Sequence, residues 1–168
     1  MSARHKLHPH RPLAHDGHAA ARDGAHQGAR QFAALAWRRG VDGQVKVLLI
    51  TSRETRRWVI PKGWPMQNRT PAEAAAQEAY EEAGVFGQAD ARPIGTYAYD
   101  KRLRDGAVQS VEVTVFPMEV FVEQLTFPEQ GQREKLWTTP QEAADKVDEP
   151  QLKTLLRAFR PTRTGALK

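Results

Sequence analysis

The segment TPAEAAAQEAYEEAG, residues 70–84, predicts a helix with both of its ends marked. Thr70 is suited to the N-cap, Pro71 to the first helical position, and Glu73 completes a capping box three residues after the cap. Gly84 is a natural C-cap because glycine readily adopts the left-handed conformation that ends many helices. Most of the alanines gather on one side, and such small side chains let a helix pack closely on a sheet. The segment therefore favours folds in which this helix lies against strands.

Three glutamates, Glu78, Glu81 and Glu82, share one side of this helix near its end, within a sector of about 100°. Like charges at this spacing repel by a few tenths of a kcal/mol per pair, and each carboxylate faces the negative end of the helix dipole. A solvated acidic face is one interpretation, but no basic residue on that face offsets the repulsion. A divalent cation reverses the sign of these effects, because clustered carboxylate oxygens are ligands for Mg²⁺ and Mn²⁺. We therefore predict a Mg²⁺ site here, with Mn²⁺ as an alternative.

Segments typical of strands and further helices flank this helix in the sequence. An Asp-Gly pair, Asp42 and Gly43, predicts a tight hairpin between the first two strands. Pro117 lies inside the longest strand segment and predicts a bulge or a break there. The expected strands are 31–37, 45–52, 58–61, 93–99 and 110–123, and the expected later helices are 139–147 and 149–159. Together they predict an α/β domain with helices covering a mixed sheet.

The composition limits the classes of function that the chain can have. Its 168 residues suffice for one domain with a real core, and 40% apolar and 27% charged residues describe an ordinary soluble protein. No apolar run approaches the length of a membrane span, and the N-terminus has no signal-peptide pattern. The absence of cysteine excludes disulfides, thiolate metal sites and cysteine nucleophiles. We therefore expect a cytoplasmic protein with no membrane association.

The first 29 residues are predicted to form a flexible tail, and residues 30–168 the folded domain. All six histidines lie in the tail: His5, His8, His10, His15, His18 and His26. The spacing HKLHPH is compatible with a transition metal, but a disordered, partly basic arm is the simpler interpretation. The folded domain then has no imidazole, so its general base must be a carboxylate, a lysine, a tyrosine or a metal-bound hydroxide.

More than half of the net charge lies in the first 30 residues, that is, in the tail together with Arg30. The first 30 residues hold five of the 25 lysines and arginines and two of the 20 acidic residues, which leaves about +2 of the +5 net charge to the remainder. The high isoelectric point therefore does not by itself indicate nucleic-acid binding.

The segment GWPMQNRTPAEAAAQEAYEEAGV, residues 63–85, resembles the Nudix box. The matching residues are Gly63, Glu78, Ala79, Glu81, Glu82, Gly84 and Val85. Two positions depart from the family pattern: Arg69 stands where the pattern has its first glutamate, and Gln77 replaces an arginine. Segments on both sides of the box, TSRETRRWVIPKG and GQREKLWTTPQEAADKV, resemble the branch that hydrolyses diphosphoinositol polyphosphates and diadenosine polyphosphates.

The resemblance implies a Nudix fold, a mixed sheet between helices, and Mg²⁺-dependent hydrolysis of a diphosphate bond. It implies that Glu78, Glu82 and the backbone carbonyl of Lys62 hold the metal, and that Glu81 is the general base. In the family pattern an arginine stands one turn before Glu81, where Gln77 keeps a hydrogen-bonding group but loses the charge. The implied partner is a small polyanionic phosphate substrate.

Basic residues outside the box are expected to choose this substrate, because arginine binds phosphate through two hydrogen bonds. The candidate substrate-binding residues are Arg30, Thr51, Ser52, Arg53, Lys62, Lys101 and Arg102; the resemblance indicates the first four, and Lys101 and Arg102 are expected on a loop. Tyr97 and Tyr99 are either stacking partners for a base or packing residues. Two other functions stay open, a weakened Nudix domain that senses nucleotides or phosphoinositols, and an RNA 5′-pyrophosphohydrolase.

Overall fold

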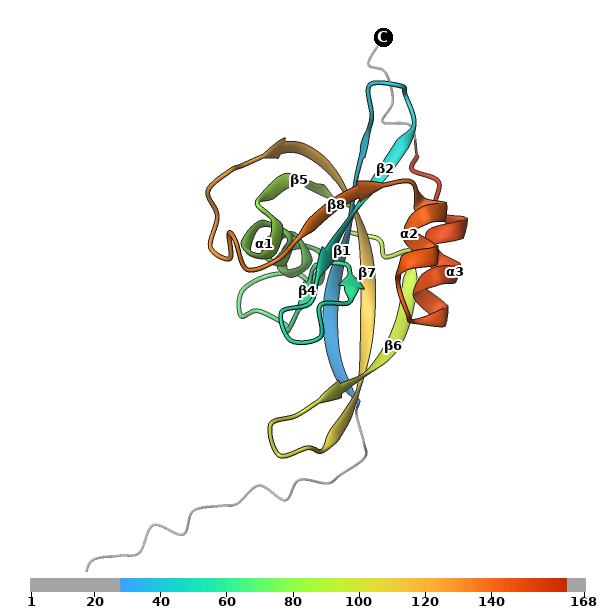
Figure 1. Ribbon diagram of the computed structural model, residues 1–168. Helices are drawn as coiled ribbons and strands as arrows, with labels where there is room; N and C mark the ends of the chain where they lie inside the picture. The colour runs from blue at the N-terminus through green and yellow to red at the C-terminus, as the bar shows by residue number, and fades with distance from the viewer. Residues whose placement is uncertain (1–27, 163–168) are drawn as a thin grey trace, which may run out of the picture.

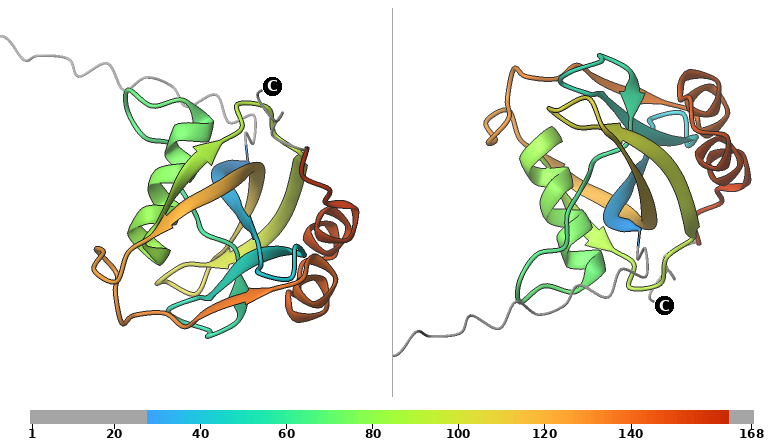
Figure 2. Two further views of the ribbon diagram at one scale, coloured as in Figure 1. Left: turned by 90° about the horizontal axis from the view of Figure 1, so that it is seen from above. Right: turned by 90° about the horizontal axis from the view of Figure 1, so that it is seen from below.

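Helices cover both faces of a mixed β-sheet in the computed structural model, which describes residues 28–162 (Figure 1). Helix α1 (Pro71–Ala83) lies on one face, and α2 (Pro140–Lys146) and α3 (Pro150–Ala158) lie on the other, as the two views of Figure 2 also show. The strands are β1 (Ala29–Arg39), β2 (Val45–Thr51), β3 (Trp58–Val59), β4 (Lys62–Gly63), β5 (Val85–Ala89), β6 (Gly95–Arg102), β7 (Val108–Glu123) and β8 (Lys135–Thr138). The predicted α/β class with helices on a mixed sheet is confirmed.

The sheet is built around a parallel pair formed by β1 and β7. Its main path runs β3, β2, β1, β7, β5, while β4 pairs with β1, β6 with β7 and β8 with β2. In the parallel pair Ala29 lies opposite Val111 and Trp37 opposite Glu119. The other strand pairs of the described sheet are antiparallel, including the predicted hairpin of β1 and β2.

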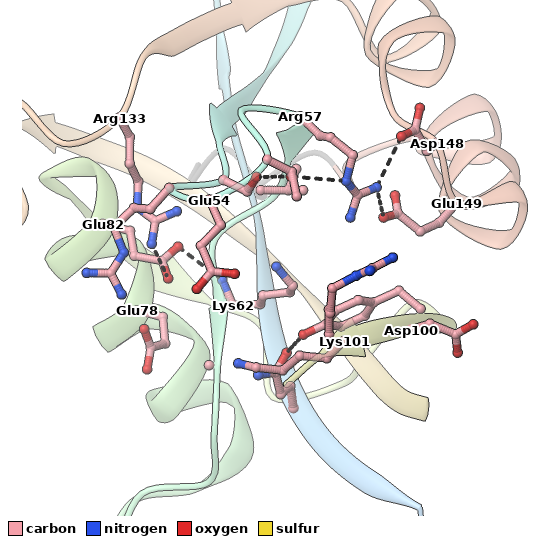
Figure 3. Close-up of a pocket in the computed structure, with 18 of the residues that line it drawn as sticks. Glu54, Arg57, Lys62, Glu78, Glu82, Asp100, Lys101, Arg133, Asp148 and Glu149 are labelled. Atoms are coloured by element: carbon pink, nitrogen blue, oxygen red, sulfur yellow. Dashed lines mark hydrogen bonds and ion pairs between the residues drawn. The ribbon is translucent and has the colours of Figure 1, made fainter. Parts of the chain in front are cut away.

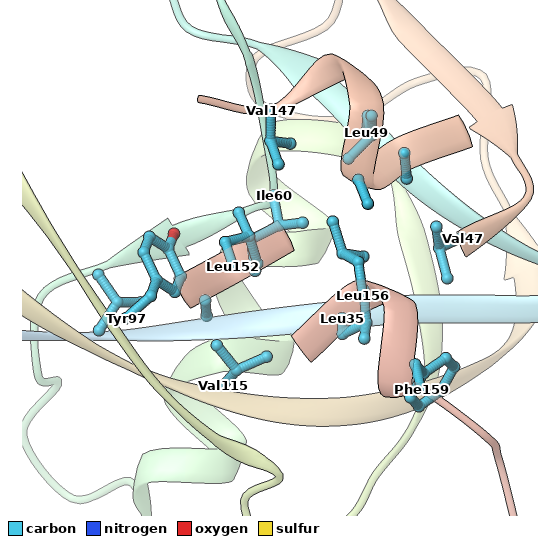
Figure 4. Packing of buried hydrophobic residues seen from close by; sticks show 14 of the residues in the cluster. Leu35, Val47, Leu49, Ile60, Tyr97, Val115, Val147, Leu152, Leu156 and Phe159 are labelled. Atoms are coloured by element: carbon cyan, nitrogen blue, oxygen red, sulfur yellow. The ribbon is translucent and has the colours of Figure 1, made fainter. Parts of the chain in front are cut away.

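Side chains of β1 and β2 alternate between two hydrophobic cores. Leu35 and Leu49 point into the core beneath α2 and α3 (Figure 4), whereas Ala34 and Leu48 point into the core beneath α1. Both strands are almost continuously apolar because each of their faces is covered. Tyr97 is 2% exposed within the α2 and α3 core, so packing is the correct interpretation of this tyrosine.

Helix α1 has the predicted ends. The hydroxyl of Thr70 accepts a hydrogen bond from the backbone of Glu73 (3.2 Å), and the Glu73 carboxylate accepts one from the backbone of Thr70 (2.9 Å). Gly84 ends the helix in the left-handed conformation, with φ 71°. Five alanines of α1 are buried against the sheet, namely Ala72, Ala74, Ala75, Ala79 and Ala83. This packing fixes the opposite, glutamate-bearing side of the helix.

The predicted bulge or break at Pro117 is wrong, because β7 continues through it. Strand β6 pairs with β7 up to Val115 and β5 begins to pair at Met118, so Pro117 lies where one partner strand gives way to the next. The backbone carbonyl of Pro117 accepts a hydrogen bond from the backbone N–H of Asp90 at this junction. Because neither β5 nor β6 pairs with Pro117 itself, the missing N–H of proline breaks no hydrogen bond between strands on that side of β7. The irregularity in the pairing of β7 occurs instead opposite Phe86 and Gly87 of β5.

Three strands were not predicted, and one predicted loop is partly a strand. The unpredicted strands β4, β5 and β8 are short, with two, five and four residues. Lys101 and Arg102 belong to β6 rather than to a loop, because β6 keeps its pairing with β7 as far as Arg102 opposite Val108. Among the described residues, no helix is long and apolar enough to cross a membrane. The histidine-rich tail lies outside the described residues, apart from its last two positions.

Candidate active site

A pocket of about 710 Å³ lies beside α1, β4 and β6 and reaches the start of α3. Glu78, Glu82 and Arg133 lie at one end of it, and Arg57, Asp148 and Glu149 lie at the other, with Lys62 between the two groups (Figure 3). Both groups and Lys62 line the same cavity, which is large enough for a substrate of nucleotide size.

Glu82 projects from the last turn of α1 and is 7% exposed. One of its carboxylate oxygens accepts a long hydrogen bond from the backbone N–H of Lys62 (3.4 Å), and the other lies 3.4 Å from Nη2 of Arg133. Burial raises the pKa of Glu82 to about 7, although the charges of Arg133 and Lys62 lower it. The carboxylate is therefore held at a pocket wall where its ionised form is poorly solvated.

Glu78 lies one turn before Glu82, and its carboxylate rests directly on Gly63 of β4. A methyl group added at Gly63 would overlap the Glu78 carboxyl group, so only glycine leaves room for it. Burial, followed by repulsion from Glu82 and Glu81, raises the pKa of Glu78 to about 7. The approach of α1 to β4 thus brings two carboxylates with raised pKa values to the same end of the pocket.

Glu81 is oriented differently from its two neighbours and does not line this pocket. Its carboxylate accepts a hydrogen bond from Nε2 of Gln77 (3.1 Å), and its backbone carbonyl accepts one from the backbone of Glu129 (3.0 Å). Gln77 thus contacts Glu81 at the position where the Nudix pattern has an arginine. Arg69, the other departure from that pattern, is exposed and also lies outside the pocket lining.

Arg133, which sequence reasoning missed, is the positive charge closest to the carboxylates. Its side chain is 10% exposed, its Nη2 lies 3.3 Å from Glu129 in addition to Glu82, and its Nη1 donates to the backbone carbonyl of Thr51 (3.1 Å). The loop before β8 supplies both Arg133 and Glu129. A loop has no periodicity that would mark an inward-pointing residue. The only sequence signal for Arg133 was its place in the segment GQREKLWTTPQEAADKV, which resembles the corresponding segment of Nudix hydrolases.

The opposite end of the pocket holds a paired arginine, and an aromatic ring lies beside Lys62. Arg57 donates to Asp148 (3.1 Å) and Glu149 (3.0 Å), which precede α3. The ammonium of Lys62 lies 5.0 Å from the centre of the Tyr99 ring, and burial lowers the pKa of Lys62. The charged groups of this end therefore come from two separate segments, the loop before β3 and the two residues before α3, while Lys62 lies between the two ends.

The NUDIX domain family model matches residues 29–159. The chain belongs to the Nudix family. Its relatives include Nudix hydrolase 12, mitochondrial, of Arabidopsis thaliana, 32% identical over 63% of this chain and 55% of that protein. Another is Nudix hydrolase 13, mitochondrial, of the same plant, 30% identical over 70% of this chain and 61% of that protein. The chain thus spans between half and two thirds of the length of these curated relatives.

Solved structures share the Nudix fold at low sequence identity. A NUDIX hydrolase from Nitrosomonas europaea superposes with a TM-score of 0.60 at 16% identity, over 78% of this chain and 87% of that one. A binary complex of the C. elegans Ap4A hydrolase gives a TM-score of 0.56 at 20% identity, over 77% of this chain and 93% of that one. At these identities the likeness establishes the fold alone.

The donors at the Glu78 end fit the divalent cation that Nudix enzymes generally use. Among residues 28–162, no three His, Cys, Asp or Glu side chains gather as a metal cage. Mg²⁺ does not require one, because proteins commonly hold it through one or two carboxylates, with waters and substrate phosphates as the other ligands. Glu78 and Glu82 are two such carboxylates, and burial raises the pKa of each to about 7. The residues present therefore suit a hard divalent cation.

The structure brings most of the predicted substrate-binding residues to the pocket. The lining includes Ser52, Arg53, Lys62, Lys101 and Arg102. Thr51 is buried instead, and its hydroxyl accepts from the backbone of Glu134 (2.9 Å). Arg30 is exposed and does not line the pocket, whereas its neighbour Gln31 does, because successive strand residues face opposite ways. Of the two tyrosines, Tyr99 lines the pocket and donates to Gln31 (2.6 Å).

Proposed function

We propose that this Nudix domain hydrolyses a phosphoanhydride bond in a small polyphosphorylated substrate, such as a diadenosine polyphosphate or a diphosphoinositol polyphosphate. The observation that carries the proposal is the pair of carboxylates, Glu78 and Glu82, at one end of a pocket whose middle holds basic side chains. Burial raises the pKa of both carboxylates to about 7, and phosphates are natural partners for the basic residues next to them.

In this proposal Glu78, Glu82 and the backbone carbonyl of Lys62 would hold a Mg²⁺ ion, with Mn²⁺ as the alternative metal. When bound, the ion would neutralise charge on the phosphate oxygens and make water a stronger nucleophile. The backbone N–H of Lys62 contacts Glu82, so the strand β4 that would present the carbonyl also orients one carboxylate. Gly63 leaves the space in which the other carboxylate lies.

Side chains of the protein would bind the phosphates and accept the proton from water. Lys62, Lys101 and Arg102 would bind phosphates, since among the described residues none of the three forms an ion pair. Glu81 is the proposed general base, held by the hydrogen bond from Gln77. The proposed setting is the cytoplasm.

A weakened domain that binds such a substrate without cleaving it is the second candidate, favoured by the neutral Gln77 in place of arginine. Product release from diadenosine polyphosphates, ADP-ribose, diphosphoinositol phosphates and triphosphorylated RNA, with Mg²⁺ or Mn²⁺, separates the two functions. The hydrolase proposal requires turnover of at least one substrate, and loss of turnover in Glu78→Gln and Glu82→Gln. The matched control is Glu112→Gln, at an exposed position on β7. Tight binding without any turnover would instead establish the sensor.

A further inference from the structure

Glu149 has a buried carboxylate oxygen that no described residue satisfies. The residue is 7% exposed and lines the pocket at the start of α3. Its Oε1 accepts from Arg57 (3.0 Å), while its Oε2 is buried without a hydrogen-bond partner in the part of the chain that the structure describes. Although Glu149 is the N-cap residue of α3, its side chain makes no capping hydrogen bond. The helix therefore gives no reason for this oxygen to be buried.

Arg57, the cation beside Glu149, is already neutralised. Its Nη1 contacts both Asp148 (3.1 Å) and Glu149 (3.0 Å), and its Nε donates to the hydroxyl of Thr55 (3.3 Å). One guanidinium thus faces two carboxylates, so Arg57 has no uncompensated charge to offer a phosphate. A phosphate placed there would meet repulsion and would have to displace existing ion pairs.

The charge of the whole pocket points the same way. Its lining carries six basic and seven acidic side chains, so it is not a strongly positive cavity. Arg53 and Arg133 are held by Glu129 (both 3.3 Å), which leaves Lys62, Lys101 and Arg102 as the lining cations without an ion pair among the described residues. With Mg²⁺ at Glu78 and Glu82, the three unpaired cations suit a diphosphate attached to an uncharged group, but they are too few for a ring with phosphates at most of its positions.

We propose that Glu149 determines substrate specificity by accepting a hydrogen bond, through Oε2, from an uncharged hydroxyl or amino group attached to the diphosphate. The inference rests on the proposed function, and it selects a substrate that carries a sugar or base over a densely phosphorylated ring. Tyr99 and the half-exposed Trp64 line the same pocket and offer flat surfaces for such a group. The diphosphate then lies toward Lys62 and the Glu78 end.

Binding measured by calorimetry with Mg²⁺ tests the inference independently of turnover. The probes are α,β-methylene ADP-ribose, which resists hydrolysis, and methylenediphosphonate, which has the two phosphorus groups but no sugar or base. In Glu149→Gln the amide oxygen must face the donors of Arg57, which places an N–H₂ group where Oε2 was. We expect this variant to bind the ADP-ribose analogue at least about tenfold more weakly and methylenediphosphonate equally well.

Asp148→Asn is the matched control, because it removes the other charge on Arg57 from an exposed side chain and leaves Oε2 of Glu149 unchanged. We expect it to change both affinities by less than about threefold, as for other exposed pairs. An analogue with inosine in place of adenosine lacks the amino group of the base and identifies the donor. If the donor is this amino group, Glu149→Gln no longer weakens binding of the inosine analogue; if the donor is a hydroxyl group, the variant still binds it more weakly than the wild type does.

A Glu149→Gln variant that weakens both probes equally, or neither, overturns the inference. The wild type supplies a test that needs no variant: it should bind the ADP-ribose analogue more tightly than inositol hexakisphosphate, and the reverse order, or binding of neither, also overturns it. If the protein binds the ADP-ribose analogue more tightly than inositol hexakisphosphate but hydrolyses no substrate, the role of Glu149 is supported and the hydrolase proposal is overturned.

Discussion

Nη2 of Arg133 lies 3.4 Å from Oε1 of Glu82, and both side chains are about nine-tenths buried. An arginine from the loop before β8 is therefore the charge partner of a carboxylate that we propose as a metal ligand. Because Arg133 also contacts Glu129 and the backbone of Thr51, it connects the β8 loop to the end of β2 and to α1. In the proposed site, Arg133 and the metal ion would compete for the carboxylate of Glu82.

Replacing Arg133 with glutamine should have opposite effects on the metal-free and metal-bound protein. Without metal, the free energy of unfolding should fall by about 3 kcal/mol, because Glu82 loses its partner within a buried site. With Mg²⁺, the stabilisation should exceed that of the wild type, since the competing guanidinium is gone. Urea unfolding with EDTA and with Mg²⁺ measures both. A smaller metal effect in Arg133→Gln would contradict the competition.

Glu78→Gln should stabilise the metal-free protein and weaken its response to metal. Glu78 forms no ion pair among the described residues, and Glu82 and Glu81 repel its charge. The gain should be at most about 1 kcal/mol at pH 8, because Glu78 is only partly buried and solvent screens the repulsion. Thermal unfolding with and without Mn²⁺ checks this, with Glu112→Gln as the control. An unfolded variant, or one with the full metal response, would argue against the assignment.

The metal-free protein should lose stability as the pH rises from about 4.5 to about 7. Burial raises the pKa of Glu78 and of Glu82 from 4.5 to about 7, so the folded state binds more protons than the unfolded state across this window. Their contribution is complete below pH 4.5 and lost above 7. Melting temperatures in EDTA should fall across the window. Saturating Mg²⁺ should reduce the fall, because the ion favours the charged carboxylates.

Gly63→Ala should disrupt the carboxylate pair while leaving the fold in place. The added methyl group would occupy the position of the Glu78 carboxyl group, which would have to rotate away from Glu82. We expect a loss of about 1 to 3 kcal/mol in stability and a larger loss in metal-induced stabilisation. Gly28→Ala is the control, since a methyl group there meets nothing within 4 Å. Retention of the full metal response in Gly63→Ala would be inconsistent with the proposed site.

Glu81 and Gln77 should affect turnover more than binding. Glu81→Gln keeps the shape of the side chain but cannot accept a proton, so kcat should fall by at least about 10² with little change in KM. Gln77→Arg restores a charge beside Glu81 and should maintain or raise kcat. Steady-state kinetics on the best substrate decides. A Glu81→Gln enzyme with normal kcat would require a different general base.

Local sequence signals explain how much of the fold was predictable. The ends of α1 depend on residues within one turn, Thr70 with Glu73 and Gly84 alone, so the sequence suffices to identify them. That Glu78 and Glu82 point to the same side was predictable because their spacing on one helix fixes their common face, and both line the pocket. Strand β5 was missed because Phe86, Gly87 and Gln88 are exposed at the sheet edge and show no alternation of apolar residues.

Tertiary pairing explains what the sequence did not reveal at the site. Arg57 and Glu149 are separated by most of the domain, and each is one of many charged residues in polar segments. Arg133 becomes the partner of Glu82 only because β8 pairs with β2 and carries its preceding loop toward α1. Charged residues in loops show no regular spacing in the sequence. Their ion-pair partners are therefore determined by the topology of the fold and not by a local sequence pattern.

The parallel pairing of β1 with β7 has a consequence for how this protein folds during its synthesis. Ala29 must find Val111, so during synthesis the central strand pair cannot form until most of the domain has left the ribosome. Until then β1 has an open edge and apolar faces, which are prone to aggregation. Helix α1, whose capping interactions are local, is free to form much earlier. The carboxylates can thus share a helix long before a finished pocket exists for them to line.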